Sequence, residues 1–264
     1  MDKSEKFSLL VRLGYVARGL VYMLLGYLAL STANRAAGGP QAAFDVIQNV
    51  PLGTLVLYLA ALGLLAYAIF KLCCALGDVE HHGSDAKGLA MRIGDGGSAI
   101  AHMLLAWTAL QFAQGDKQRA GSDDAGQQAA SSVLTWDLGN FLIGVIGIAL
   151  IIGAALQARN AVSAHFMRLV SGAPEPVLWI GRAGHAARAV VFLLIGWSLV
   201  RSAWFENGKE VKGLGDALMS LRDNGTLYTL VAIGLLLFGV FSLIVARYRT
   251  IPDFDSSSLK PALH

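Results

Sequence analysis

The chain has 264 residues, of which 55% are hydrophobic and 15% are charged, and its formal net charge is +3. A soluble domain carries about 25% charged residues, so this composition argues against a soluble protein. The small positive charge does not indicate a nucleic-acid partner, because no basic stretch interleaved with aromatic residues occurs. We therefore expect a protein whose main partner is the lipid bilayer.

Six apolar runs come close to the roughly 20 residues that a membrane-spanning helix requires. In chain order they cover residues 13–30, 52–76, 93–112, 138–156, 183–200 and 226–246. The third and fifth runs contain polar residues, but they match the first run in sequence. The predicted fold is therefore all-α and polytopic, with six transmembrane helices in a single membrane domain that covers residues 1–264.

One pattern occurs three times and overlaps the first, third and fifth runs. The copies are RLGYVARGLVYMLLGYLAL from Arg12, RIGDGGSAIAHMLLAWTAL from Arg92 and RAGHAARAVVFLLIGWSLV from Arg182. Each copy opens a unit of two spans, which gives repeats at 12–76, 92–158 and 182–247. Since each unit crosses the bilayer twice, successive units enter it in the same direction. Parallel repeats are related by an axis along the membrane normal, which predicts pseudo-threefold symmetry.

Charge placement predicts the orientation. Two thirds of the 21 Lys and Arg residues lie on the side that six spans assign to both termini and to the second and fourth loops. Basic residues favour cytoplasmic loops, so both termini are expected in the cytoplasm, with the chain in the cytoplasmic membrane. The N-terminal stretch that includes the first apolar run is too long for a secretory signal and carries Arg12 and Arg18, so we expect it to stay as a helix.

The segments between the spans differ in character. AAFDVIQNVPLG from Ala42 and DALMSLRDNG from Asp216 have apolar residues three and four apart, which predicts short helices at the outer membrane surface. Residues 115–132 are polar and predict a flexible loop. Residues 251–264, with two prolines and three consecutive serines, predict a disordered tail.

The repeated pattern resembles the bacterial membrane family called domain of unknown function 1206, in which two-helix units recur three times. Arg18, Gly19, Tyr22 and Gly26 fit the family pattern best. The middle copy departs from it, with Ser98 in place of arginine and Ala106 in place of glycine. The resemblance covers nearly the whole chain and implies the architecture and the membrane location. It implies no activity.

Polar residues recur on one face of the first helix of each repeat, because positions three, four and seven apart share a face. The three faces present Tyr15, Arg18, Tyr22 and Gly26; Asp95, Ser98, His102 and Ala106; and His185, Arg188, Phe192 and Gly196. A cation within a span normally faces the protein interior or water. We therefore predict a polar chamber lined by Arg18, Arg188, His102, His185 and Tyr22.

Two interpretations of this polar chamber remain open. Two converging guanidinium groups would favour a small anion or an anionic lipid headgroup, as a binding or permeation site. Alternatively, Asp95 pairs with Arg18 or Arg188 and the charges only hold the repeats together. Both interpretations need close helix packing, at Gly14, Gly19, Gly26, Gly94, Gly184 and Gly196. Glycine-rich faces would equally suit self-association or a partner membrane protein.

Other reactive residues carry weaker signals. His81 and His82 have a metal-binding composition, but adjacent histidines in a glycine-rich loop are usually solvated. Cys73 and Cys74 are juxtamembrane residues that could be lipidated, although small apolar residues often end a helix. Asp95, Ser98 and His102 share a helix face, but sequence divergence between the repeats explains this trio without a catalytic role. Neither a phosphate-binding loop nor a nucleophile elbow occurs, so we predict no catalytic residues, metal or cofactor.

Overall fold

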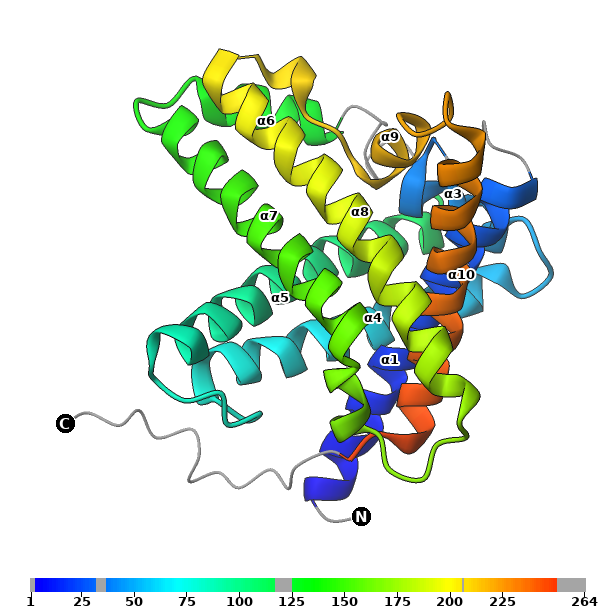
Figure 1. Ribbon diagram of the computed structural model, residues 1–264. Coiled ribbons are helices and arrows are strands. Elements are labelled where there is room, and N and C mark those ends of the chain that lie inside the picture. Colours follow the sequence, from blue (N-terminus) through cyan, green and yellow to red (C-terminus); the bar gives the residue numbers. More distant parts are fainter. Residues whose placement is uncertain (1–2, 32–36, 117–124, 206, 251–264) are drawn as a thin grey trace.

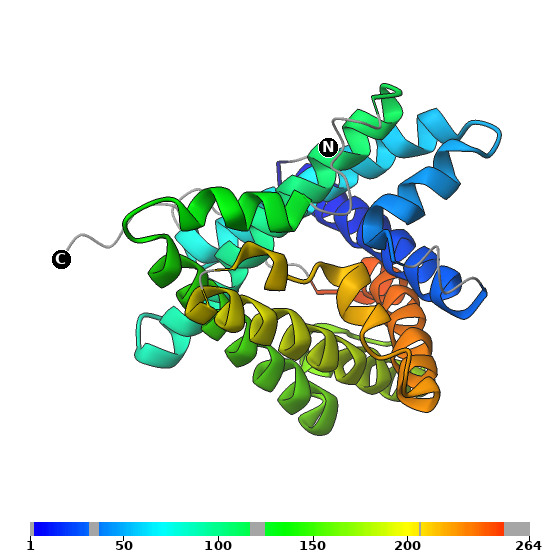
Figure 2. The same cartoon turned by 90° about the horizontal axis from the view of Figure 1, so that it is seen from above.

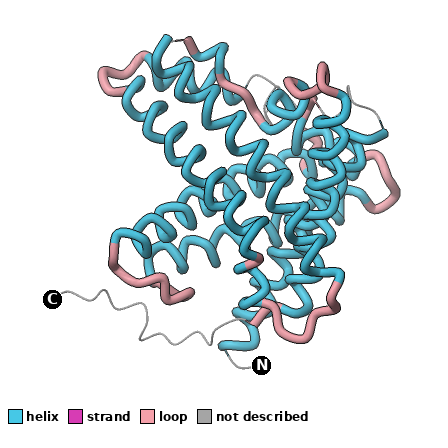
Figure 3. The backbone as a smooth tube through the Cα atoms, viewed as in Figure 1, coloured by secondary structure: helices cyan, strands magenta, loops and turns pink. Residues whose placement is uncertain are grey.

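The computed structural model describes residues 3–31, 37–116, 125–205 and 207–250, and Figures 1 and 3 show that these residues form helices joined by short loops. Among the described residues, five helices are long and apolar enough to cross a membrane. They lie in α1 (Lys3–Ser31), α4 (Gly53–Gly77), α7 (Gly139–Ser163), α8 (Pro176–Phe205) and α10 (Gly225–Tyr248). The predicted span at 93–112 is also helical and lies in α5 (Ala86–Ala113), which is not among these five.

Three short α-helices connect the long ones. The two amphipathic stretches form α3 (Gly39–Gln48) and α9 (Leu214–Met219). The third, α6 (Ala125–Leu134), includes residues 125–132 of the predicted flexible loop. Its Ala130 packs with Ile143 of α7 and Val211. This tertiary contact stabilises a helix where the polar composition had predicted a flexible loop. The rest of the predicted loop at 117–124 and the predicted tail at 251–264 lie outside the described residues.

Side-chain caps define the loop that follows α4. Asp78 ends that helix in the left-handed conformation, with a φ of +50°. Its carboxylate accepts hydrogen bonds from the backbone N–H groups of His82 and Gly83, at 2.7 and 2.9 Å. Asp85 then caps α5 by accepting from the N–H of Gly88 at 2.8 Å, as N-cap residues do. These bonds hold the loop at 78–85 against the end of α4.

The long helices form three pairs that cross repeat boundaries. The first helix of the second and third repeats packs most extensively on the second helix of the repeat before it, which gives the pairs α5–α4 and α8–α7. The first helix of the first repeat packs in the same way on the second helix of the third repeat, which gives the pair α1–α10. In Figure 2, α1 lies beside α10, and α7 lies beside α8. Contacts of α1 with α4 and of α8 with α10 join the pairs. In the described part of the chain, the corresponding contact of α5 with α7 is not extensive, and the arrangement is open there.

The repeated arginine at the start of each pattern caps the partner helix. Arg12 donates to the carbonyl oxygens of Ala246 and Arg247 at the end of α10, at 2.6 and 2.7 Å. Arg92 donates to Ala75 and Leu76 at the end of α4, at 2.8 and 2.9 Å. Arg182 donates to Val162 near the end of α7, at 3.2 Å. The last carbonyls of a helix lack intrahelical partners, so each arginine satisfies groups that would otherwise be unpaired.

The repeated glycine, two residues after the repeated arginine, is closely packed in two copies and open in the one on α5. A Cβ atom at Gly14 would lie 2.6 Å from the Cβ of Tyr67, and one at Gly184 would lie 2.8 Å from the Cβ of Phe238. Glycine is therefore required where α1 meets α4 and where α8 meets α10. A Cβ at Gly94 of α5 would meet nothing within 4 Å. The second copy keeps the glycine but lacks the close contact.

Candidate functional site: a buried cationic seam

Arg18 lies inside the bundle among aromatic rings and hydroxyl groups. Its side chain comes from α1, and the residue is 7% exposed. Its Nη1 donates to the hydroxyl of Tyr67 at 2.6 Å, and its Nε and Nη2 donate to Ser242 Oγ at 3.2 and 3.0 Å. Its guanidinium carbon also lies 4.7 Å from the ring centre of Tyr15. Tyr67 belongs to α4 and Ser242 to α10, so Arg18 joins three helices.

Arg188 of α8 approaches the same aromatic core from another helix. Its guanidinium carbon lies 4.5 Å from the ring centre of Phe238, and that of Arg18 lies 5.0 Å from the same ring. Arg188 also lies 4.7 Å from the ring of Phe192 and 5.7 Å from the ring of Tyr22. Cation–π contacts of this kind stabilise a desolvated cation by about 2 kcal/mol. The Nε of Arg188 is buried and has no hydrogen-bond partner.

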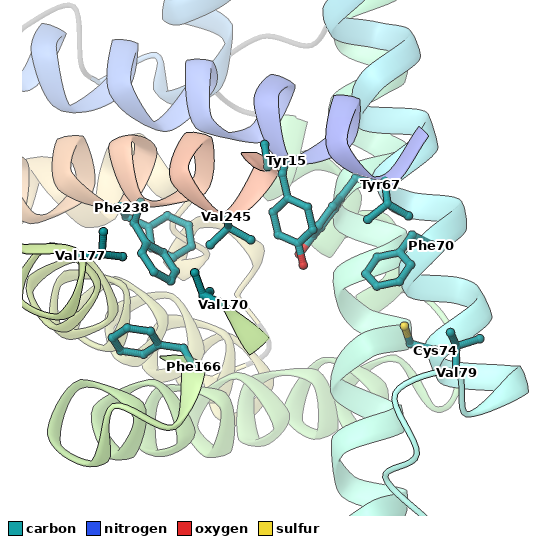
Figure 4. Packing of buried hydrophobic residues seen from close by; sticks show 13 residues of the cluster. Tyr15, Tyr67, Phe70, Cys74, Val79, Phe166, Val170, Val177, Phe238 and Val245 are labelled. Carbon is teal, nitrogen blue, oxygen red and sulfur yellow. The ribbon is translucent and has the colours of Figure 1, made fainter. Parts of the chain in front are cut away.

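We call this arrangement the cationic seam. It consists of Arg18, Arg188 and the rings of Tyr15, Tyr22, Tyr67, Phe192 and Phe238. Figure 4 shows Tyr15, Tyr67 and Phe238 among the buried side chains between the helices. The seam extends toward α5, because the rings of Tyr67 and His102 are 4.5 Å apart. The seam therefore reaches from α8 to α5, which lies beside the opening between α5 and α7.

The predicted pairing of Asp95 with an arginine of the chamber is wrong. Asp95 Oδ1 lies 2.7 Å from the Nζ of Lys71, and its Oδ2 lies 3.3 Å from His82 Nε2. Lys71 also lies 3.4 Å from Glu80, which forms an ion pair with Arg249. Asp95 points toward α4 because it lies one helical turn nearer the end of α5 than Ser98, which occupies the position of Arg18. We call Lys71, Glu80, His82, Asp95 and Arg249 the ion cluster.

The ion cluster shifts the two titratable groups of the loop in opposite directions. Burial alone would raise the pKa of Glu80, but Lys71, His82 and Arg249 outweigh it and hold that pKa well below the ordinary value of 4.5. A hydrogen bond with Glu80 and the charge of Asp95 raise the pKa of His82 above its ordinary 6.5, against the effect of burial. The folded state therefore favours an ionised Glu80 and a protonated His82.

Charge compensation differs between the two groups of residues. In the ion cluster, two carboxylates face Lys71 and Arg249. In the cationic seam, neither Arg18 nor Arg188 forms an ion pair with a carboxylate of the described residues. Tyr15 connects the two groups, since its ring lies 4.7 Å from Arg18 and 5.2 Å from Arg249. The seam thus holds the buried Arg18 and the half-buried Arg188, and no carboxylate of the described residues neutralises either cation.

The predicted chamber residues are only partly brought together. Arg18, Arg188 and Tyr22 meet around the ring of Phe238. His185 also reaches this ring, with ring centres 5.7 Å apart, but it stacks on Phe166 at 4.8 Å and its Nδ1 forms a hydrogen bond with the side chain of Gln157. It therefore serves the α7–α8 contact.

The residues Asp95, Ser98 and His102 do not form a catalytic arrangement. His102 Nδ1 lies 2.7 Å from the carbonyl oxygen of Ser98 and 3.5 Å from its hydroxyl, so the imidazole is bonded to its own helix. Asp95 is engaged by Lys71. A nucleophile needs a base within reach and a group that orients that base, and these three side chains do not provide it.

Sequence reasoning missed every contributor from the second helices. These residues are Tyr67, Lys71, Phe238, Ser242 and Arg249, together with Glu80 of the loop. One signal was available, because Lys71 is a charged residue near the end of an apolar run and lies four positions after Tyr67. Those two residues share a helix face, and an ionisable residue in a span marks a site.

The apolar helices and the buried polar seam define an integral membrane protein made of repeated helical units. A family model described as Domain of Unknown Function (DUF1206) matches residues 13–78, 93–164 and 183–249. The chain belongs to this family, and the three matched segments confirm the three predicted repeats.

One curated protein is similar to nearly the whole chain. The chain is 34% identical over 249 residues to "Uncharacterized protein YxxB" of Bacillus subtilis (strain 168), and the match covers 90% of each chain. No solved structure matches the chain.

Proposed function

We propose that this protein binds an anionic group, either a small anion or the headgroup of an anionic lipid, at Arg18 and Arg188. The observation that carries the proposal is that the buried Arg18 and the half-buried Arg188, whose Nε is buried, meet around Phe238 without a carboxylate partner among the described residues. A buried charge costs several kcal/mol unless another charge compensates it. An anion between the two arginines would supply that compensation and could form bidentate hydrogen bonds.

The proposal includes the placement of the chain in the membrane. The protein would have six spans, including α5, in an approximate threefold arrangement of helix pairs, and the three repeats support this arrangement. Both termini would lie in the cytoplasm of a bacterial cell, by the distribution of basic residues. In this orientation the ion cluster lies toward the cytoplasmic end of α4.

A second candidate function is structural. Arg18 already makes hydrogen bonds to Tyr67 and Ser242, which favours a role in holding helices together. Under this alternative, the protein is a scaffold or an accessory to another membrane protein.

Native mass spectrometry of the gently extracted protein separates the two functions. Wild type is compared with an Arg18→Ala, Arg188→Ala double variant and with Arg159→Ala, whose side chain is exposed on α7. A bound anion that wild type and Arg159→Ala retain and the double variant loses supports the proposal. A folded wild type without a bound anion, after supply of both inorganic phosphate and anionic lipid, favours the structural role.

The same variants test permeation. Radiolabelled phosphate uptake into proteoliposomes is measured for wild type and for the double variant. Uptake that requires both arginines indicates a path for a small anion, whereas equal uptake contradicts it. Retention of an anionic lipid without phosphate uptake indicates a headgroup site.

A further inference from the structure

Four metal-ligating side chains from three segments meet beside the end of α4. Cys74 belongs to α4, Glu80 and His82 to the loop that follows it, and Asp95 to α5. The sulfur of Cys74 and carboxylate oxygens of Glu80 and Asp95 lie within 4.8 Å of one another. His82 Nε2 lies 3.4 Å from a Glu80 oxygen and 3.3 Å from an Asp95 oxygen. We propose that these four side chains form a binding site for a divalent zinc-type cation.

The donor types and spacings suit such an ion. Zinc takes thiolate, imidazole and carboxylate ligands at about 2.0–2.3 Å in a tetrahedron, so its ligand atoms lie about 3.3–3.7 Å apart. The separations of His82 Nε2 from the two carboxylates, at 3.3 and 3.4 Å, already match this spacing. Closing the remaining donors, which span up to 4.8 Å, needs a contraction of about 1 Å. A loop that contributes two ligands allows this movement.

The position between the carboxylates already holds a cation. The Lys71 ammonium lies 2.7 Å from Asp95 and 3.4 Å from Glu80, and it would compete with a metal for these oxygens. Lysine is a compact charge on a flexible four-carbon stem, so it can move aside. With Lys71 displaced, three anionic ligands face Arg249 and a divalent ion, and the charges balance.

Metal binding at this site releases a proton. The Cys74 thiol must lose its proton to water before the sulfur can bind the ion, and His82 must be neutral, because only those forms are ligands. Zinc affinity is therefore expected to rise with pH. The side chain of His82 is 21% exposed, against 9% for Glu80 and 12% for Asp95, so the ion would reach the site past His82.

Two adjacent residue pairs supply matched controls. Cys74 and His82 belong to the proposed site, whereas their neighbours Cys73 and His81 do not. Full-length protein without an affinity tag is freed of metal in detergent, incubated with Zn²⁺, desalted and analysed for zinc. We expect one zinc per chain in wild type, Cys73→Ser and His81→Ala. In Cys74→Ser and His82→Ala we expect at least about a tenfold loss of affinity.

Co²⁺ gives a second readout that reports the sulfur ligand directly. The thiolate-to-cobalt absorption band should appear in wild type and in Cys73→Ser and disappear in Cys74→Ser. Lys71→Met should bind zinc more tightly, because the competing ammonium is gone. Wild type that retains no zinc overturns the proposal, as does equal binding by the two cysteine variants or by the two histidine variants. Loss of zinc in His81→Ala alone would identify adventitious surface binding and would also overturn it.

Discussion

Lys71 Nζ lies 2.7 Å from Asp95 Oδ1, and this ion pair joins α4 to α5 across the boundary between the first and second repeats. It occupies the carboxylate that could have neutralised an arginine of the cationic seam. Arg18 and Arg188 consequently have no carboxylate partner among the described residues, and their contacts are aromatic rings and hydroxyl groups. The positive charge of the proposed anion site thus depends on the Lys71–Asp95 ion pair, which lies about one helical turn away from it.

Glu80→Gln should destabilise the protein strongly. The change leaves Arg249, which is 8% exposed, without its carboxylate, and breaking a buried ion pair on one side costs about 3–5 kcal/mol. Chemical unfolding in detergent measures the loss, with Glu175→Gln as the control because Glu175 is exposed. A loss as small as that of the control would mean that water solvates the cluster.

Stability should depend on pH through Glu80 and His82. The folded-state pKa of Glu80 is lowered from 4.5, so its contribution is present above that value and is lost as pH falls toward the folded pKa. The folded-state pKa of His82 is raised from 6.5, so its contribution is complete below 6.5 and is lost as pH rises through the folded pKa.

Thermal unfolding of wild type and His82→Ala, measured from below pH 6.5 into the alkaline range, tests the predicted pH dependence of the His82 contribution. The wild-type advantage should be largest in mildly acidic buffer and should shrink toward alkaline pH. His81→Ala serves as the control, and its difference from wild type should not follow the same trend. An advantage of wild type that grows with pH would contradict the raised pKa.

Alanine at the repeated glycines should have opposite effects in the first and second copies. Gly14→Ala places a Cβ 2.6 Å from that of Tyr67 and 2.9 Å from the Tyr67 backbone, and such overpacking costs about 1–3 kcal/mol. Gly94→Ala meets open space, so the better helix propensity should stabilise the protein by about 0.5–1 kcal/mol. Unfolding midpoints in detergent measure both changes. Equal destabilisation would show that α5 and α7 make close contact in the membrane.

Tyr67→Phe should weaken the hold on Arg18. The variant removes the hydroxyl that accepts from Nη1 at 2.6 Å, and a lost hydrogen bond to a buried charged group costs about 1.5–3 kcal/mol. Tyr58→Phe is the control, since Tyr58 is 44% exposed on the same helix. If an anion also binds Arg18, Tyr67→Phe should not abolish its retention in native mass spectrometry, because both arginines remain.

Much of the architecture was predictable from local sequence. In a bilayer every backbone polar group must be satisfied within the protein, so an apolar run of about 20 residues is helical wherever it packs. The threefold copy of the arginine and glycine pattern then predicted the repeats, which the family model matches. Helix α6 escaped prediction because its polar residues 125–132 are stabilised by a buried contact of Ala130 rather than by their own composition.

The site depended on information that lies between helices. Sequence periodicity placed Arg18 and Arg188 on the inner faces of their helices, and both guanidiniums contact the ring of Phe238. The same periodicity could not say that Lys71 would take Asp95, or that the opening would fall between α5 and α7. Those outcomes depend on the register of one helix against another, and side-chain pairing over a few ångströms is decided when the helices pack. The sequence by itself determined which segments are helices and which faces are polar, whereas the tertiary structure decided which charges meet.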